Sequence, residues 1–148
     1  MPRIRAATIV AHKDATRRAL LDAAAELFRA QGYAETNLAD ITAFAGIGRT
    51  TIYEYFTDKE DVLVNLVEDA VPSVVAGMLA DLPEDLDMRE RLAELIQRGL
   101  NFVSTDHALG SMVMRDLPTL SPGAAARVRA VHAPIEREIV RLCRRGIA

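Results

Sequence analysis

Three consecutive residues, Arg49, Thr50 and Thr51, have the side chains with which proteins read base pairs in the major groove. An arginine can donate two hydrogen bonds to one guanine, and a threonine offers a methyl group to thymine and a hydroxyl to a base or a phosphate. Such side chains are needed near the N-terminus of a recognition helix. The run therefore predicts a base-contacting segment.

Hydroxyl and ammonium groups close to this run are candidates to hold the DNA backbone, because phosphate oxygens accept hydrogen bonds from both. Tyr53 and Tyr55 follow in the same segment, and Lys59 lies where the next helix is expected to begin. Free amides at that helix N-terminus would add to the attraction. The alternative is that Tyr53 packs in the core and that Arg49 is an ordinary solvated surface residue.

Apolar residues recur at helical spacing along the chain and no segment alternates as a strand does, so the sequence predicts an all-α protein. In the first part of the chain we expect a long helix over about residues 15–30 and two short helices over about 38–45 and 49–55. This order is a helix-turn-helix. Its expected core consists of Ile41, Ala45, Ile47, Ile52 and Phe56.

The turn between the two short helices has local signals of its own. Asn37 is a good N-cap for the first short helix, and Asp40, three residues later, completes an approximate capping box. Gly46 permits the left-handed backbone that a tight turn between crossing helices needs. These residues predict the turn independently of the apolar pattern.

The charge of the chain does not by itself indicate a nucleic-acid partner, since 18 Lys and Arg residues face 21 Asp and Glu residues. Positive charge is concentrated at the N-terminus, where one acid, Asp14, accompanies Arg3, Arg5, Lys13, Arg17 and Arg18. We expect residues 1–13 to be a basic arm that can lie along a minor groove. A disordered solubilising tail is the alternative.

Composition also predicts the compartment. The single cysteine, Cys143, cannot form an internal disulfide, which favours a reducing environment. The longest uncharged apolar stretch, residues 70–80, is short of the roughly 18 to 20 residues that cross a bilayer. The apolar run over residues 6–11 is too weak for a secretory signal. We therefore expect a cytoplasmic protein with no membrane partner.

Three segments with fixed spacing, Gly32–Leu38, Ala45–Phe56 and Lys59–Leu63, form a multi-part motif. Through them residues 16–63 resemble the TetR family of transcriptional regulators. The resemblance implies an all-α homodimer that binds double-stranded operator DNA with its N-terminal domain, over residues 14–63, and releases it when a small molecule enters the C-terminal domain. Most members are repressors. The resemblance also implies base contacts by Arg49, Thr50 and Thr51 and phosphate contacts by Thr36, Tyr53, Tyr55 and Lys59.

Three residues depart from the usual pattern of that family. Asn37 replaces Thr or Ser and remains a good cap, and Thr42 replaces Ala. Gly48 stands where the family commonly has a Ser that caps the recognition helix. Because glycine has no side-chain acceptor, we expect weaker capping and the loss of one phosphate contact, which affects operator affinity rather than the fold.

Residues 64–148 are expected to form a helical regulatory domain, which the resemblance makes ligand-binding. The helix that begins at about residue 58 is expected to continue to about residue 79, and the pattern predicts further helices over about 88–105, 108–117 and 123–145, with an interruption or kink at Pro134. Large apolar side chains that could line an effector pocket are Met78, Phe102, Met112 and Met114. The alternative is that most of them are ordinary core residues.

No constellation in the sequence supports catalysis, a metal site or a cofactor. His107 and His132 lack a second histidine or cysteine at a ligand spacing. Glu90 and Glu94 alternate with arginines, which indicates a solvated, ion-paired helix face. We therefore do not expect an enzyme.

Members of the family usually continue with two further helices that form the dimer interface, so the regulatory domain is expected to be incomplete at its C-terminus. Operator binding normally needs two recognition helices about 34 to 36 Å apart. A rival hypothesis is therefore a helical ligand-binding or hetero-pairing module without operator binding of its own. The effector, the operator sequence and the sign of regulation are not determined by the sequence.

Overall fold

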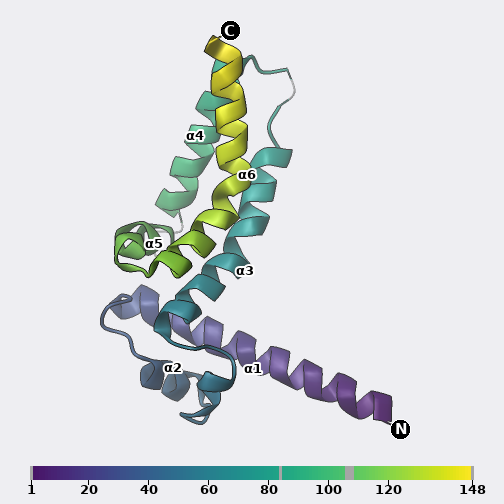
Figure 1. Cartoon of the computed structure of the whole chain (residues 1–148), viewed down its shortest axis with the longest axis vertical. Coiled ribbons are helices and arrows are strands. Elements are labelled where there is room, and N and C mark those ends of the chain that lie inside the picture. Colours follow the sequence, from purple (N-terminus) through teal and green to yellow (C-terminus); the bar gives the residue numbers. More distant parts are fainter. Residues whose placement is uncertain (1, 84, 106–108, 148) are drawn as a thin grey trace. The chain divides into compact units, whose positions relative to one another are not determined.

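The computed structural model describes the backbone of residues 2–83, 85–105 and 109–147, and side chains over 8–83, 85–102, 110–111 and 115–145. Within the described backbone every regular element is a helix (Figure 1), which confirms the predicted all-α class. The chain divides into two units, Met1–Leu66 and Val67–Ala148, close to the boundary expected after residue 63. The two units are described separately.

The first unit contains α1 (Pro2–Gln31), α2 (Leu38–Ala45), the 3-10 helix η1 (Thr51–Glu54) and the beginning of α3 (Lys59–Ala80). Three of the five predicted core side chains, Ile41, Ile52 and Phe56, are at most 2% exposed. Residues of α1 and α3 in the same unit are buried as well, namely Leu20, Ala24, Phe28, Val62 and Leu63. Ala45 and Ile47 are only half-buried.

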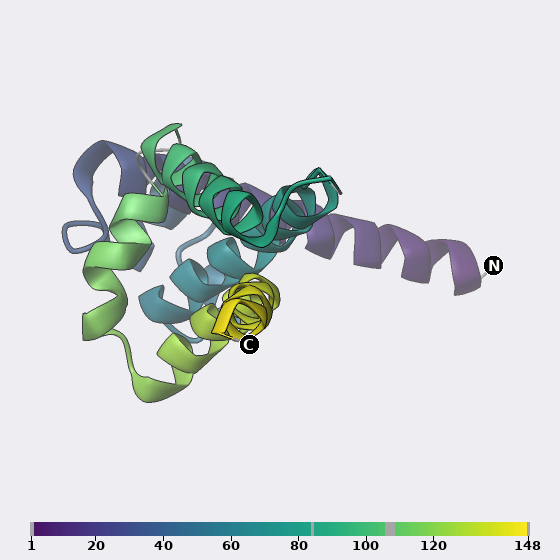
Figure 2. The ribbon, with the colours of Figure 1, turned by 90° about the horizontal axis from the view of Figure 1, so that it is seen from above.

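The predicted N-terminal arm is instead the first half of α1, which runs for 30 residues from Pro2. Proline is favoured in the first helical turn, and the alanine-rich sequence that follows has high helix propensity. Residues 8–15 are all exposed. Figures 1 and 2 both show this half of α1 extending beyond the other elements of its unit. None of residues 8–15 is buried. The periodicity of buried apolar residues therefore could not predict that this part of the chain is helical.

The second unit contains the rest of α3, α4 (Met88–Thr105), α5 (Leu109–Asp116), the 3-10 helix η2 (Leu117–Thr119) and α6 (Pro122–Ile147). The predicted helix over residues 88–105 is confirmed. A core cluster lies between these helices, and its buried members are Leu82, Leu95 and Leu142, with Leu79, Met88, Leu92 and Ile139 packed against them.

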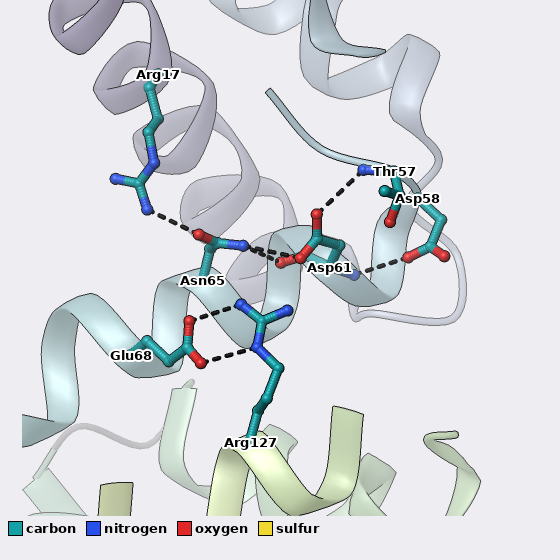
Figure 3. Close-up of polar contacts among 7 residues, drawn as sticks. All are labelled: Arg17, Thr57, Asp58, Asp61, Asn65, Glu68 and Arg127. Carbon is teal, nitrogen blue, oxygen red and sulfur yellow. Dashed lines mark hydrogen bonds and ion pairs between the residues drawn. The ribbon is translucent and has the colours of Figure 1, made fainter. Parts of the chain in front are cut away.

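Polar contacts also join the helices of the second unit. Arg127 on α6 donates from Nε and Nη2 to the two carboxylate oxygens of Glu68 on α3, at 2.9 and 2.7 Å (Figure 3). Arg98 on α4 donates to the carbonyls of Met78 and Asp81 at the end of α3, and it pairs with Glu94 as predicted for a charged helix face. Arg98 thus supplies donors to carbonyls at a helix end, which lack a donor from within the helix, and Arg127 joins α6 to α3.

Pro134 does not break the helix, because α6 continues through this residue as one element, and the kink expected there stays a prediction. A proline in a helix removes a single backbone donor. Residues on both sides of it pack on the unit, including Val128 at 2% and Leu142 at 3% exposed. Burial along both halves compensates for the lost hydrogen bond.

One helix, α3, is long and apolar enough to cross a membrane by length and composition alone. Core helices pass the same test, and Val62, Leu63 and Val67 of α3 are fully buried. Glu68 and Asp69 lie near its middle, where charge is costly inside a bilayer. The burial and the two charges are typical of a core helix.

Candidate nucleic-acid interface

The start of α2 is fixed by the capping box that the sequence predicts. The amide of Asp40 donates to Asn37 Oδ1 at 3.0 Å, and the amide of Asn37 donates to Asp40 Oδ2 at 2.9 Å. This box leaves the amides of Leu38 and Ala39 as N-terminal donors without an acceptor inside the helix. Such donors attract an anion.

The turn after α2 also confirms the prediction. Gly46 has φ 67° and ψ 29°, in the left-handed region that glycine tolerates best. The amide of Ile47 donates to the carbonyl of Thr42 at 2.9 Å. Thr42 itself is 2% exposed, and its hydroxyl donates to the carbonyl of Ala39 at 3.0 Å. The unusual threonine is therefore accommodated with its hydrogen bond satisfied.

The predicted recognition helix over residues 49–55 is shorter and tighter than expected. It is a turn followed by η1, in which the amides of Thr51 and Tyr53 donate to the carbonyls three residues earlier. Thr50 at its start makes no side-chain cap. The β-branched run from Thr50 to Ile52 has low helix propensity, and Gly48 offers no side-chain acceptor. Both features disfavour a regular α-helix here.

The recognition segment nevertheless presents the predicted side chains. Arg49, Thr50 and Tyr53 are exposed, Tyr53 to 62%, while Ile52 beneath them is fully buried. The alternative that Tyr53 is a core residue is therefore wrong. Thr51 is half-buried. Tyr55 is also half-buried, with its ring 6.4 Å from that of Phe56.

A hollow of about 370 Å³ joins the start of α2 to the recognition segment. Its lining residues include an arginine and a tyrosine, whose guanidinium and phenol are donors suited to a phosphate group, together with the first residues of α2. The residues that line it are Thr36, Asn37, Leu38, Ala39, Arg49, Tyr53 and Lys59. The fold thus brings together four of the seven residues predicted to contact DNA.

Two of these four have their polar groups engaged within the protein. Thr36 is 1% exposed, and its hydroxyl donates to the carbonyl of Gly32 at 2.8 Å and accepts from Gln31 Nε2 at 3.2 Å. The hydroxyl thus binds the end of α1. This geometry argues against the predicted phosphate contact by the Thr36 side chain.

Lys59 has a similar internal role. Its Nζ donates to the carbonyls of Tyr33 at 2.7 Å and Ala34 at 3.2 Å, and it lies 4.4 Å from the centroid of the Tyr33 ring. That ring packs edge-on against Phe28, with centroids 5.3 Å apart. Two of the three ammonium protons are used in holding the connection between α1 and α2, and the predicted phosphate contact of Lys59 stays a prediction.

A polar network at the start of α3, drawn in Figure 3, was not predicted. Asp58 Oδ1 accepts from the amide of Asp61 at 2.7 Å, and Asp61 Oδ2 accepts from the amide of Thr57 at 3.1 Å. Asn65 donates to Asp61 and accepts from Arg17 Nη2 at 2.8 Å. Arg17 and Asn65 are 48 residues apart, so no local pattern could pair them. The network anchors α1 to α3.

The effector-pocket candidates are only partly tested. Met78 and Phe102 are half-buried, and the side chains of Met112 and Met114 lie outside the described residues. A hollow of about 410 Å³ in the second unit has other walls: Leu79, Leu82, Arg91, Pro134, Arg137, Glu138 and Arg141. Neither of the two described candidates, Met78 and Phe102, lines it.

A carboxylate in this second hollow has a shifted pKa. A hydrogen bond from Arg141 lowers the pKa of Glu138, the charges of Arg91 and Arg145 lower it further, and burial opposes the change. Arg141 donates from Nε to Glu138 Oε2 at 2.7 Å. Three arginines, Arg91, Arg137 and Arg141, line this hollow beside Glu138, so its charged side chains are mostly cationic.

Residues suited to metal binding do not gather in the described part of the chain, where no group of three or more His, Cys, Asp or Glu could hold an ion. The Nδ1 of His132 lies 2.9 Å from the carbonyl of Val128, one turn earlier in α6. His107 lies outside the described residues.

Comparison with known proteins places the helix-turn-helix in a family. Residues 20–66 match the family described as "Bacterial regulatory proteins, tetR family". The chain is 31% identical over 98 residues to the "Fatty acid metabolism regulator protein" of Bacillus subtilis, covering 66% of this chain and 50% of that protein. It is 32% identical over 135 residues to the "HTH-type transcriptional repressor ComR" of Escherichia coli, covering 87% and 64%.

Solved structures agree with these sequence matches. The regulator FadR of Bacillus subtilis in complex with stearoyl-CoA aligns with TM-score 0.71 and 25% identity, over 88% of this chain and 70% of that one. A tetR-family regulatory protein from Rhodococcus has TM-score 0.74 at 22% identity, over 89% and 70%, and shows a shared fold. The chain spans about half the length of the first curated relatives that it matches. From this match and these relatives together, the chain carries the helix-turn-helix domain of the TetR family of transcriptional regulators.

Proposed function

We propose that this chain acts as a sequence-specific DNA-binding transcriptional regulator in the cytoplasm. The observation that carries the proposal is the hollow at the start of α2, where backbone amides face Arg49 and Tyr53 beside an exposed recognition segment. In this assignment Arg49, Thr50 and Thr51 contact bases, and Tyr53, Tyr55 and the α2 amides hold phosphates. Thr36 and Lys59 position the segment that precedes α2.

We further propose that the regulator is a homodimeric repressor released by a small-molecule effector. A dimer supplies the two recognition segments that a palindromic operator requires. Curated relatives include a repressor, ComR, and an activator, FasR, so the sign of regulation has to be measured. Because the FadR relative was solved with stearoyl-CoA, a long-chain acyl-CoA is the first effector to test.

Selection from a random duplex library tests the DNA-binding proposal. We expect the chain to enrich a palindrome. Replacing Arg49 with alanine should remove about 1 to 3 kcal/mol of discrimination, a loss of about 5- to 150-fold on the enriched duplex with little change on random DNA. Arg29→Ala is a matched control, since Arg29 lies in the same unit but pairs with Glu26 on α1. Equal losses for Arg49→Ala on both duplexes would contradict base reading.

The effector is tested on the complex with the enriched duplex. Stearoyl-CoA is expected to release the DNA, whereas coenzyme A alone is not, because only the acyl chain offers apolar surface to bury. Release by both compounds to the same extent would argue against an acyl effector. A chain that is folded but enriches no sequence would favour the interaction-module hypothesis instead.

A further inference from the structure

Charge is segregated within the first unit, and the division falls in the middle of α1. The first 18 residues carry five of the 18 Lys and Arg residues of the chain and one of its 21 Asp and Glu residues. Residues 19–66, which hold the helix-turn-helix, carry three basic residues and eight acidic ones. The part of the unit that reads DNA therefore has a net charge of -5, which opposes binding to a polyanion.

Two of the three cations in residues 19–66 are also engaged within the protein. Arg29 forms an ion pair with Glu26 at 2.6 Å, and Lys59 donates to the carbonyls of Tyr33 and Ala34. Arg49 alone among the three makes no side-chain hydrogen bond or ion pair with the described residues. Attraction to the DNA backbone must therefore come largely from another part of this unit.

Residues 2–18, which we term the basic projection, have the charge to supply it, and residues 8–15 and 18 among them are exposed. Figures 1 and 2 show this part of α1 continuing past the other elements of its unit. Arg17 is held by Asn65 at the base of the projection. Lys13 and Arg18 are exposed and make no side-chain contact with the described residues. The sequence adds Arg3 and Arg5, so four cations besides Arg17 belong to it.

We propose that the basic projection is a second DNA-contacting element, which neutralises backbone phosphates while the recognition segment reads bases. This inference rests on the proposed function. An α-helix with its side chains is about 10 to 12 Å wide, whereas the minor groove of B-DNA is about 6 Å wide. The helical form therefore excludes the minor-groove arm that the sequence suggested. The projection instead follows the phosphates, over a length of about 25 Å.

The projection also exposes two apolar side chains, Ile9 at 59% and Val10 at 57%. A basic helix with exposed apolar residues can bind an anionic lipid surface. DNA is favoured here because the same helix contributes Leu20 and Phe28 to the buried core of the first unit, so its cations are held in the unit that reads DNA. Lipid binding becomes an outcome of the test.

The test compares the full chain with a variant that carries Arg3→Gln, Arg5→Gln, Lys13→Gln and Arg18→Gln. Glutamine keeps a helix propensity similar to that of arginine and lysine, so α1 should persist, which circular dichroism checks. The control replaces four exposed arginines of the second unit by glutamine, which alters the net charge equally: Arg89, Arg129, Arg137 and Arg144. Binding to the selected duplex and to a random duplex is measured by fluorescence anisotropy at salt concentrations from about 50 to 300 mM, because counterion release makes affinity depend on salt in this range.

Each lost phosphate contact lowers the slope of log K against log salt by about 0.9. For each bound protomer, we expect the projection variant to lose about 3 to 4 from the slope on both duplexes and the control variant to lose less than about 1. Equal slopes for the variant and the unmodified chain would overturn the inference while leaving operator selection intact. So would binding of the projection to phosphatidylglycerol vesicles with an unchanged DNA slope.

The two proposals fail in different ways. If no sequence is enriched but the variant lowers the slope on random DNA, the projection contact stands and the sequence-specific regulator does not. If the unmodified chain binds neither duplex, both are wrong.

Discussion

Replacing Lys59 with methionine separates its two candidate roles, as a structural donor and as a phosphate contact. The ammonium makes two hydrogen bonds to carbonyls and lies over the Tyr33 ring. A hydrogen bond from a charged group contributes about 1.5 to 3 kcal/mol when well buried, and an exposed cation–π contact about 0.5 to 1. Because Lys59 is only half-buried, we take the lower ends and expect a loss of about 2 kcal/mol in the free energy of unfolding.

Urea denaturation measures this loss, and Lys13→Met is the matched control. Lys13 is the other lysine of the chain, and it is exposed without a side-chain contact to the described residues. Methionine keeps the length of the side chain and removes the charge. If Lys59→Met unfolds within about 0.5 kcal/mol of Lys13→Met, the structural assignment is refuted.

The salt dependence of DNA binding gives an independent readout on the same variant. If Lys59 acts by holding the segment before α2, folded Lys59→Met protein keeps its salt slope and loses affinity through mispositioning of the α2 amides. A direct phosphate contact instead predicts a slope lower by about 0.9. A slope loss of that size, with unchanged stability, would restore the role predicted from sequence.

Four further variants test local features of the fold. Asn37→Ala removes the α2 cap and is expected to cost about 1 kcal/mol of unfolding free energy, whereas a loss below about 0.3 would show that the capping box is not stabilising. Gly46→Ala should cost about 1 to 2 kcal/mol from backbone strain alone, because an added Cβ meets nothing within 4 Å, and an unchanged urea midpoint would contradict this. Gly48→Ser should be more stable than Gly48→Ala by about 1 kcal/mol, since only serine can cap the recognition segment, and equal stabilities would exclude a cap there. Because the pKa of Glu138 is lowered in the folded state, its charged form stabilises the fold at pH values above the unfolded pKa of about 4.3. The destabilisation by Glu138→Gln should therefore disappear as the pH falls through the folded pKa. A difference in urea midpoint that does not change with pH would refute the pairing.

Local sequence signals gave the frame of the candidate interface correctly. The capping box at Asn37, the left-handed Gly46 and the burial of Ile41, Ile52 and Phe56 follow from short-range rules, and each is observed. These rules succeed because a helix cap, a positive φ and an apolar stripe each depend only on residues within one or two helical turns of one another. Arg49, Thr50 and Tyr53 were likewise predicted to be exposed and are.

The sequence left the role of a side chain open where folding brings more than one partner within its reach. Thr36 and Lys59 have groups suited to phosphates, but folding brings the carbonyls of Gly32, Tyr33 and Ala34 to them. A buried carbonyl needs a donor, and a side chain that supplies one is less available to a ligand. Residue type alone cannot distinguish these two uses.

The sequence by itself determined the all-α class, the helix-turn-helix and the family, because these depend on periodicity and on motifs of contiguous residues. Only the tertiary structure decided that the basic N-terminus is a projecting helix, that Arg17 is tied to Asn65, and which predicted DNA contacts remain free. The reason is physical: an exposed helix has no buried stripe to reveal it, and a pairing between residues far apart in the chain exists only after the core has brought their helices together.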